Sequence, residues 1–288
     1  MHRVQLLGVQ RRRFSALVLG AASLGSVGLL FGVQACGSDS ETTGKRVVLE
    51  TEVSVDDVAT TGFTTAVGWN VTLSKAVLST GPFYYFDGAP PVVRLETTPL
   101  WRLALRRVVR SLGEGVAHAH PGHYHSGTAL GEMIEPWSVD LLAGVTELPV
   151  GEGVTGTYRS ARFSFTSPPV GPMAEALESH AALVEGVAER AGEPARAFRA
   201  IADLSDIERS AAEGHVEGCE FTELAIEGDG RVTLKVNPKV WFDLVDFAEL
   251  EVAAGDARAE FPDDSQPKIA FAQGLAQLSA YKFSFAGE

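Results

Sequence analysis

Four of the seven histidines fall within eight residues, in the stretch HAHPGHYH at residues 118–125. Proline at the second position and glycine at the third suit a type II turn, because proline fixes φ and glycine accepts a positive φ. A turn over 120–123 would place His120 opposite His123, with His118 and His125 as the next pair on the same side. We therefore expect four imidazoles to share one face.

A transition-metal ion is the ligand that this cluster suits best. Crowded imidazoles repel one another when protonated, whereas a divalent metal ion uses their lone pairs. Imidazole suits zinc and copper, while calcium and magnesium prefer oxygen, and a nearby methionine ligand would favour copper. An exposed polar loop that binds no metal is the alternative. The predicted copper or zinc ligands are His118, His120, His123, His125, Glu132 and Met133.

A second group of candidate ligands lies in the stretch HVEGC. His215, Glu217 and Cys219 occupy alternate positions, so an extended chain would present all three on one face. Nitrogen, oxygen and sulfur ligands together can bind zinc or copper. The alternative is a strand that enters the sheet with Cys219 in the core and His215 at its rim. His180 lies on an apolar stripe and is expected to be structural.

The N-terminal residues have the layout of a secretory signal peptide, with a basic head, an apolar stretch from Phe14 to Ala35, and then Cys36. RRRF at residues 11–14 resembles the twin-arginine export pattern, and VQAC at 33–36 resembles the processing box of bacterial lipoproteins. The resemblance implies that residues 1–35 are removed and that Cys36 carries the lipid. The alternative is an uncleaved apolar helix that spans the bilayer.

The same resemblance implies a place in the cell envelope, facing the periplasm and held to the membrane by the lipid on Cys36. Residues 36–46 are small and polar, as in a flexible tether. Gly37 stands where an aspartate would retain some lipoproteins at the inner membrane, which favours the outer membrane. The export pattern also favours a bound cofactor, because it resembles that of proteins that fold before export.

Charge and cysteine content narrow the possible partners further. Residues 1–35 carry Arg3, Arg11, Arg12 and Arg13 and no acid, so their removal changes the net charge from −13 to −17. So acidic a protein is not expected to bind nucleic acid or to lie on an anionic membrane surface. With Cys36 lipidated, only Cys219 remains, and no internal disulfide can form. The sequence indicates no particular protein partner.

Most of residues 47–288 predict β-strands. Trp69, Val71 and Leu73 alternate with polar residues, and FYYF, ARFSF and YKFSF are further short strands. The likeness of ARFSF to YKFSF suggests two related positions in a sheet. EGDGRVTLKV predicts a hairpin with its turn at 228–230 and with three apolar side chains inward: Val232, Leu234 and Val236.

Three regions predict helices: residues 98–113, the pair 172–190 and 193–211, and residues 265–277, which begin with Ser265 as a cap. The first contains a dense basic patch, which we expect to face solvent and to pair with the acidic body. The predicted fold is therefore mainly β with an α insertion: a single domain over 47–288, a β-sandwich or distorted barrel carrying a helical pair at about 170–212.

The sequence lacks a glycine-rich phosphate loop, a G-x-S-x-G elbow and an H-E-x-x-H helix. We therefore expect a metal-binding protein that serves in acquisition, buffering or delivery at the cell envelope. One alternative is a metal-dependent enzyme that uses the same histidines with Glu132 as general base. Another is a non-catalytic envelope interaction module in which the histidines are incidental. Three protein ligands plus water would favour the enzyme.

Overall fold

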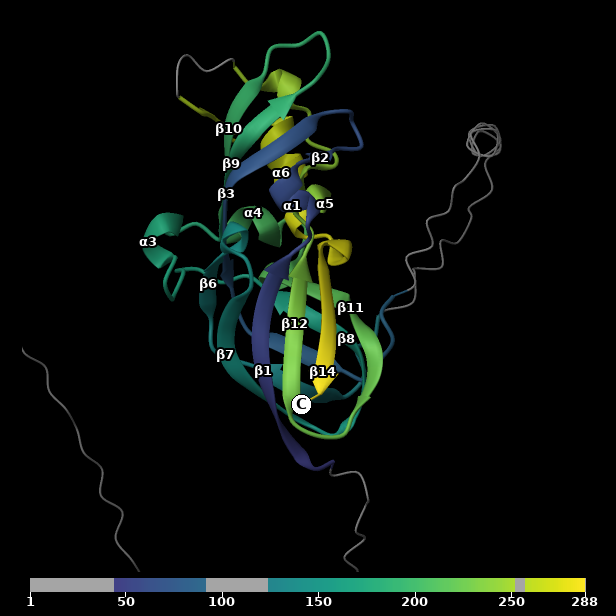
Figure 1. Cartoon of the computed structure of the whole chain (residues 1–288). Coiled ribbons are helices and arrows are strands. Elements are labelled where there is room, and N and C mark those ends of the chain that lie inside the picture. The colour runs from purple at the N-terminus through teal and green to yellow at the C-terminus, as the bar shows by residue number, and fades with distance from the viewer. Residues whose placement is uncertain (1–43, 92–123, 252–256, 288) are drawn as a thin grey trace, which may run out of the picture. The chain divides into compact units, whose positions relative to one another are not determined.

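The computed structural model describes residues 44–91, 124–251 and 257–287, and strands dominate it (Figure 1). The mainly β fold expected from the sequence is confirmed as a closed barrel of eight strands and a second sheet of six strands, with few helices. No helix in these three ranges is long and apolar enough to cross a membrane.

The barrel mixes parallel and antiparallel strand pairs. β1 is parallel to β12 and β11 is parallel to β14, whereas the remaining neighbours are antiparallel. Around the barrel the order is β1 (Arg46–Val55), β12 (Gly230–Val236), β14 (Tyr281–Gly287), β11 (His215–Ile226), β8 (Gly156–Ser164), β4 (Phe83–Phe86), β5 (Ala129–Met133) and β7 (Thr146–Val154).

The second sheet is built on β3, which pairs with β2, β6 and β9. Its strands are β13 (Ala259–Glu260), β10 (Arg196–Ala202), β9 (Ala182–Glu189), β3 (Asn70–Thr80), β2 (Phe63–Thr64) and β6 (Trp137–Asp140). Two helices, α5 (Pro238–Phe242) and α6 (Gln266–Leu275), pack against this sheet, where Phe242 lies between Phe198 and Phe271 at ring distances of 5.4 and 5.1 Å.

The remaining helical elements are single turns between strands. They are α1 (Val58–Thr61), α3 (Ala174–Leu177), α4 (Leu204–Glu208), η1 (Leu141–Ala143), η2 (Ala212–Gly214), η3 (Phe247–Glu249) and η4 (Leu278–Ala280). One continuous hydrophobic core includes side chains from the barrel and from the second sheet. A smaller cluster is separate from this core and consists of Val77, Leu177, Leu183 and Ile201.

Aromatic side chains fill the interior of the barrel. Tyr85, Tyr158 and Phe221 are fully buried, and their rings lie within 5.5–6.3 Å of one another. Glycine in β7 makes room for them, because a Cβ on Gly153 would lie 2.5 Å from the Tyr158 hydroxyl. That hydroxyl lies 2.8 Å from the carbonyl oxygen of Leu130. Packed rings, rather than an open lumen, occupy this part of the interior.

Several sequence expectations are confirmed at the level of single strands. Trp69, Val71 and Leu73 are buried and alternate with exposed neighbours, because β3 packs one face against the core. The three apolar side chains of β12 point inward as expected: Val232, Leu234 and Val236. Helix α6 begins as expected, because the Ser265 hydroxyl accepts a hydrogen bond from the Lys268 amide at 3.4 Å.

The prediction of a helical pair at about 170–212 is wrong in this region, which is mainly strand. Residues 182–189 and 196–202 form the antiparallel strands β9 and β10, and only the short helices α3 and α4 flank them. From Val184 onward β9 alternates buried and exposed residues, a period of two that the many alanines obscured. Gly186 also suits this strand, because a Cβ there would lie 2.4 Å from the Thr72 carbonyl oxygen of β3.

The prediction of a hairpin across residues 228–230 is also wrong, because the strands on either side of this turn, β11 and β12, do not pair with each other. β14 lies between β11 and β12, antiparallel to β12 and parallel to β11. The likeness of ARFSF and YKFSF has a structural counterpart, because β8 and β14 flank β11 on its two sides and Phe163 stacks on Tyr281 at 4.1 Å. The helix expected at 98–113 lies outside the described residues.

Candidate functional site

The histidine cluster lies largely outside the described residues. His118, His120 and His123 belong to residues 92–123, whereas His125 lies between Tyr124 and β5 with an exposed side chain. The expected turn at Pro121-Gly122 lies outside the described residues as well. What the structure adds is the part of the barrel to which this segment is attached.

Residues 92–123 connect β4 to β5, which are neighbouring antiparallel strands of the barrel. The described residues at the two ends of this segment, Pro91 and Tyr124, meet at Gly218 of β11. A Cβ on Gly218 would lie 2.4 Å from Pro91 Cδ and 3.4 Å from Tyr124 Cζ. The Gly88 amide also donates to the Ser126 carbonyl oxygen at 3.0 Å. The segment therefore leaves and rejoins the barrel at one place on its outer wall.

Gly218 is part of a β-bulge that changes the second group of candidate ligands. Val216 pairs with Phe163 and Cys219 pairs with Ala161, so β11 has one residue more than β8 over this interval, and Gly218 has a φ of +74°. Cys219 is consequently buried in the core, whereas His215 and Glu217 are partly exposed. The expected shared face of His215, Glu217 and Cys219 is not formed.

The chemistry of Cys219 also argues against a metal ligand. Burial raises the pKa of its thiol to about 12, because the apolar surroundings disfavour the charged thiolate. Within the described ranges no three histidine, cysteine, aspartate or glutamate side chains are arranged to bind a metal ion.

Glu132 and Met133 lie on opposite faces of β5. Successive side chains of a strand alternate in direction, and here Met133 is fully buried in the core while Glu132 is exposed. An ion held on the outer wall would be out of reach of the Met133 thioether unless the core opened. The argument for copper that depended on this sulfur therefore loses its support, whereas Glu132 remains accessible.

Polar groups surround Tyr124 where the segment rejoins the barrel. The Tyr124 hydroxyl donates to Ser160 Oγ at 2.6 Å, and Ser160 in turn donates to the Gly88 carbonyl oxygen at 2.7 Å. Burial is the main reason that the pKa of Tyr124 is raised, and the nearby carboxylate of Glu217 adds to the effect. Glu217 itself pairs with Arg162 at 2.6 Å. Glu217 of the second group of candidate ligands therefore lies near Tyr124, the residue before His125.

A cavity of about 490 Å³ adjoins this wall and is lined by His215 and Glu213, which form a Ser–His–Glu arrangement with Ser164, a residue outside the lining. His215 Nδ1 lies 2.9 Å from Ser164 Oγ, and its Nε2 lies 3.7 Å from a Glu213 oxygen. Such an order is found in nucleophilic triads, but Ser164 is fully buried and cannot reach a substrate. Ser164 and His215 meet because the β8–β11 register pairs them, which local sequence cannot indicate.

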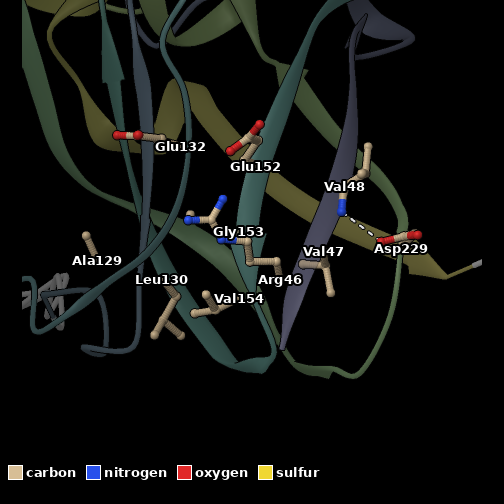
Figure 2. A pocket seen from close by; sticks show the side chains of 11 residues that line it. Arg46, Val47, Val48, Ala129, Leu130, Glu132, Glu152, Gly153, Val154 and Asp229 are labelled. Atoms are coloured by element: carbon tan, nitrogen blue, oxygen red, sulfur yellow. Dashed lines mark hydrogen bonds between the residues drawn. The ribbon is translucent and has the colours of Figure 1, made fainter. Parts of the chain in front are cut away.

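A second hollow, of about 570 Å³, lies along β1, β7 and β5 (Figure 2). Figure 2 shows Glu132 and Glu152 on neighbouring strands, with Arg46 on the third. Asp229, in the loop before β12, accepts a hydrogen bond from the Val48 amide at 2.8 Å. The two glutamates face solvent, and neither forms an ion pair among the residues that the structure describes.

Searches with protein-family models, among curated proteins and among solved structures found no match to this chain. The described residues define a mainly β protein in which an eight-stranded barrel shares its core with a second sheet. Its functional assignment therefore depends on the chain's own residues.

Proposed function

We propose that the protein is an exported lipoprotein, held in the cell envelope by a lipid on Cys36, that binds a transition-metal ion for acquisition, buffering or delivery. The ligands are the imidazoles of His118, His120, His123 and His125. The observation that carries this proposal is the presence of four histidines within eight residues, arranged about Pro121-Gly122. A metal ion is the ligand that turns such crowding into stabilisation.

The attachment of the histidine segment supports this proposal. Pro91 and Tyr124 are packed on one bulge of a rigid barrel, which is the usual setting for a binding loop. His125 is exposed directly beside this anchor, and Glu217 provides a carboxylate on the same wall. The Glu217 carboxylate is therefore an additional candidate oxygen ligand near the attachment point of the histidine segment.

The burial of the two candidate sulfur ligands, Met133 and Cys219, limits which metal ions the protein is expected to bind. Met133 and Cys219 are both buried in the core, so neither sulfur is accessible to an ion on the outer wall. Imidazole and carboxylate ligands suit Zn²⁺ and Cu²⁺, whereas Cu⁺ prefers soft sulfur. We therefore propose zinc or copper(II) as the bound ion.

Metal content and calorimetry test this proposal. Protein isolated from the periplasm without added metal should contain zinc or copper, and replacing the four histidines by asparagine should weaken Zn²⁺ or Cu²⁺ binding more than about 100-fold. A His180→Gln variant is the matched control, because His180 Nδ1 bonds Asp203 at 2.6 Å, at the start of α4. Metal-free isolated protein that shows no calorimetric heat with either ion would contradict the proposal.

A further inference from the structure

One outer surface of the barrel combines acidic and exposed apolar side chains across three neighbouring strands. We call this surface, on β1, β7 and β5, the acidic face. Its five carboxylates outnumber its one cation, Arg46, and Arg231 of the adjoining strand β12 reaches its edge. The carboxylates are those of Glu50, Glu52, Glu132, Glu147 and Glu152.

Like charges lie directly opposite one another on the acidic face. Glu132 is the register partner of Glu152, and Glu52 is the register partner of Glu147. Such pairs destabilise a sheet unless cations compensate for them. Arg231 compensates Glu50 at 2.7 Å and Glu52 at 3.7 Å. Within the described ranges Glu132, Glu147 and Glu152 form no ion pair.

Apolar side chains lie among these carboxylates. Val48 is 47% exposed, and Val150 and Ile134 are each 62% exposed. Val48 is the register partner of Glu152, so apolar and acidic groups alternate across the face. The hollow of about 570 Å³ lies on the same three strands (Figure 2). A ligand that matches this surface must be both cationic and apolar.

We propose that the acidic face binds residues 101–110 of the same chain. Their sequence, WRLALRRVVR, places four arginines among apolar side chains: Arg102, Arg106, Arg107 and Arg110. This run is the dense basic patch of the mature chain, so its charge is complementary to the carboxylates. Arginine also presents paired donors that match a carboxylate, which suits it to the uncompensated glutamates.

The point of attachment makes this docking reachable. Residue 101 is ten residues beyond Pro91, and ten extended residues span up to about 35 Å. Pro91 lies on β11, and β7 is four strands away through β8, β4 and β5, or about 19 Å at the usual strand spacing. Attachment to the same chain also raises the effective concentration of the segment above that of a separate cationic protein.

Cross-linking in the mature chain tests this docking. The protein carries Cys36→Ser and Leu105→Cys with a second cysteine at Val150→Cys, on the acidic face, or at Leu224→Cys, on β11. Leu224 is exposed and on the strand that anchors the segment, so a segment without a preferred site would reach it readily. Glutathione disulfide is the oxidant, and the buried Cys219 is not expected to react.

The 105–150 disulfide should form at least about tenfold faster than the 105–224 disulfide, given the effective concentration of a docked segment. The triple variant Glu132→Gln, Glu147→Gln, Glu152→Gln should slow it about tenfold, because three exposed ion pairs are lost. The control Glu175→Gln, Glu189→Gln, Glu208→Gln changes three exposed carboxylates elsewhere and should not.

Equal rates for the two cysteine pairs would overturn the proposal, as would a triple variant that cross-links as fast as the control. Disulfide-linked dimers in place of the internal bond would also overturn it, because they would assign the face to a second copy. Loss of folding is not expected in the triple variant, because it removes like-charge contacts. Circular dichroism of each variant confirms that the comparison is made between folded proteins.

Discussion

The side of the strand on which a residue lies determines whether its side chain is buried or accessible to a ligand. The β11 bulge at Gly218 moves Cys219 into the core and leaves His215 and Glu217 outside. The alternation in the sequence favoured the correct interpretation, a buried Cys219 with His215 at the rim, over a metal site, but it did not predict the bulge. A bulge shifts the alternation by one residue, and nothing in HVEGC except its glycine indicates one.

The raised pKa of Cys219 predicts how the free energy of unfolding depends on pH in alkaline solution. The folded pKa of its thiol is about 12, above the ordinary value of 9.0, so the unfolded chain loses this proton first as pH rises. The free energy of unfolding should therefore fall as pH rises above 9, with a contribution on the order of 1 kcal/mol per pH unit from this group.

Urea unfolding at pH 7, 9 and 10.5 measures this effect. A Cys219→Ala variant, once its loss of stability at pH 7 is subtracted, should lose less stability at alkaline pH than the parent protein. Tyr158, whose pKa is also raised to about 12, contributes equally to both proteins. Parallel curves for the two proteins would show that the Cys219 thiol does not contribute.

At the scale of elements, strands with a clear period of two were predictable and their partners were not. β3 and β12 bury the side chains that their alternation indicates. β9 was assigned to a helix, because Val184 and Val187 continue a helical spacing of apolar residues that begins at Met173. Only its pairing with β3 and β10 decides between these periods.

The bulge in β11 should be sensitive to a single methyl group. A Gly218→Ala change places a Cβ where Pro91 Cδ would be 2.4 Å away, at a backbone φ of +74°. We expect a loss of about 1–3 kcal/mol in the free energy of unfolding, from backbone strain together with the steric contact.

Gly192→Ala is the matched control for this change. Gly192 has a φ of +82°, but a Cβ there would meet no atom within 4 Å, so it reports the backbone strain alone. Thermal unfolding should show the larger loss for Gly218→Ala. Equal losses would mean that Pro91 and Tyr124 do not hold the histidine segment against the barrel.

At the scale of the whole molecule, the mainly β fold is confirmed, whereas export and lipidation of the chain remain predictions. The barrel and its second sheet follow the class that the sequence indicated, because alternating strands and turns dominate residues 47–91, 129–251 and 257–287. The order of strands around the barrel was out of reach, since β1, β12 and β14 meet through contacts between distant parts of the chain. For the same reason the Ser164–His215 contact could not be foreseen.

The proposed lipid anchor gives a prediction at this scale. A Cys36→Ser variant expressed in a bacterial host should lose labelling by radioactive palmitate and should move from the detergent phase to the aqueous phase, because one acylated residue carries the membrane affinity. Cys219→Ala retains Cys36 and should behave as the parent protein. Labelling that persists in the Cys36→Ser variant would exclude the anchor.

The position of β14 in the barrel determines when the barrel can close during synthesis and folding. β11 and β12 cannot be joined around the barrel until residues 281–287 are inserted between them, so the wall stays open while the ribosome makes the first 280 residues. The nascent barrel therefore exposes two unpaired strand edges, which are prone to aggregate. Chaperones that shield such edges should bind this chain until residues 281–287 have paired with both strands.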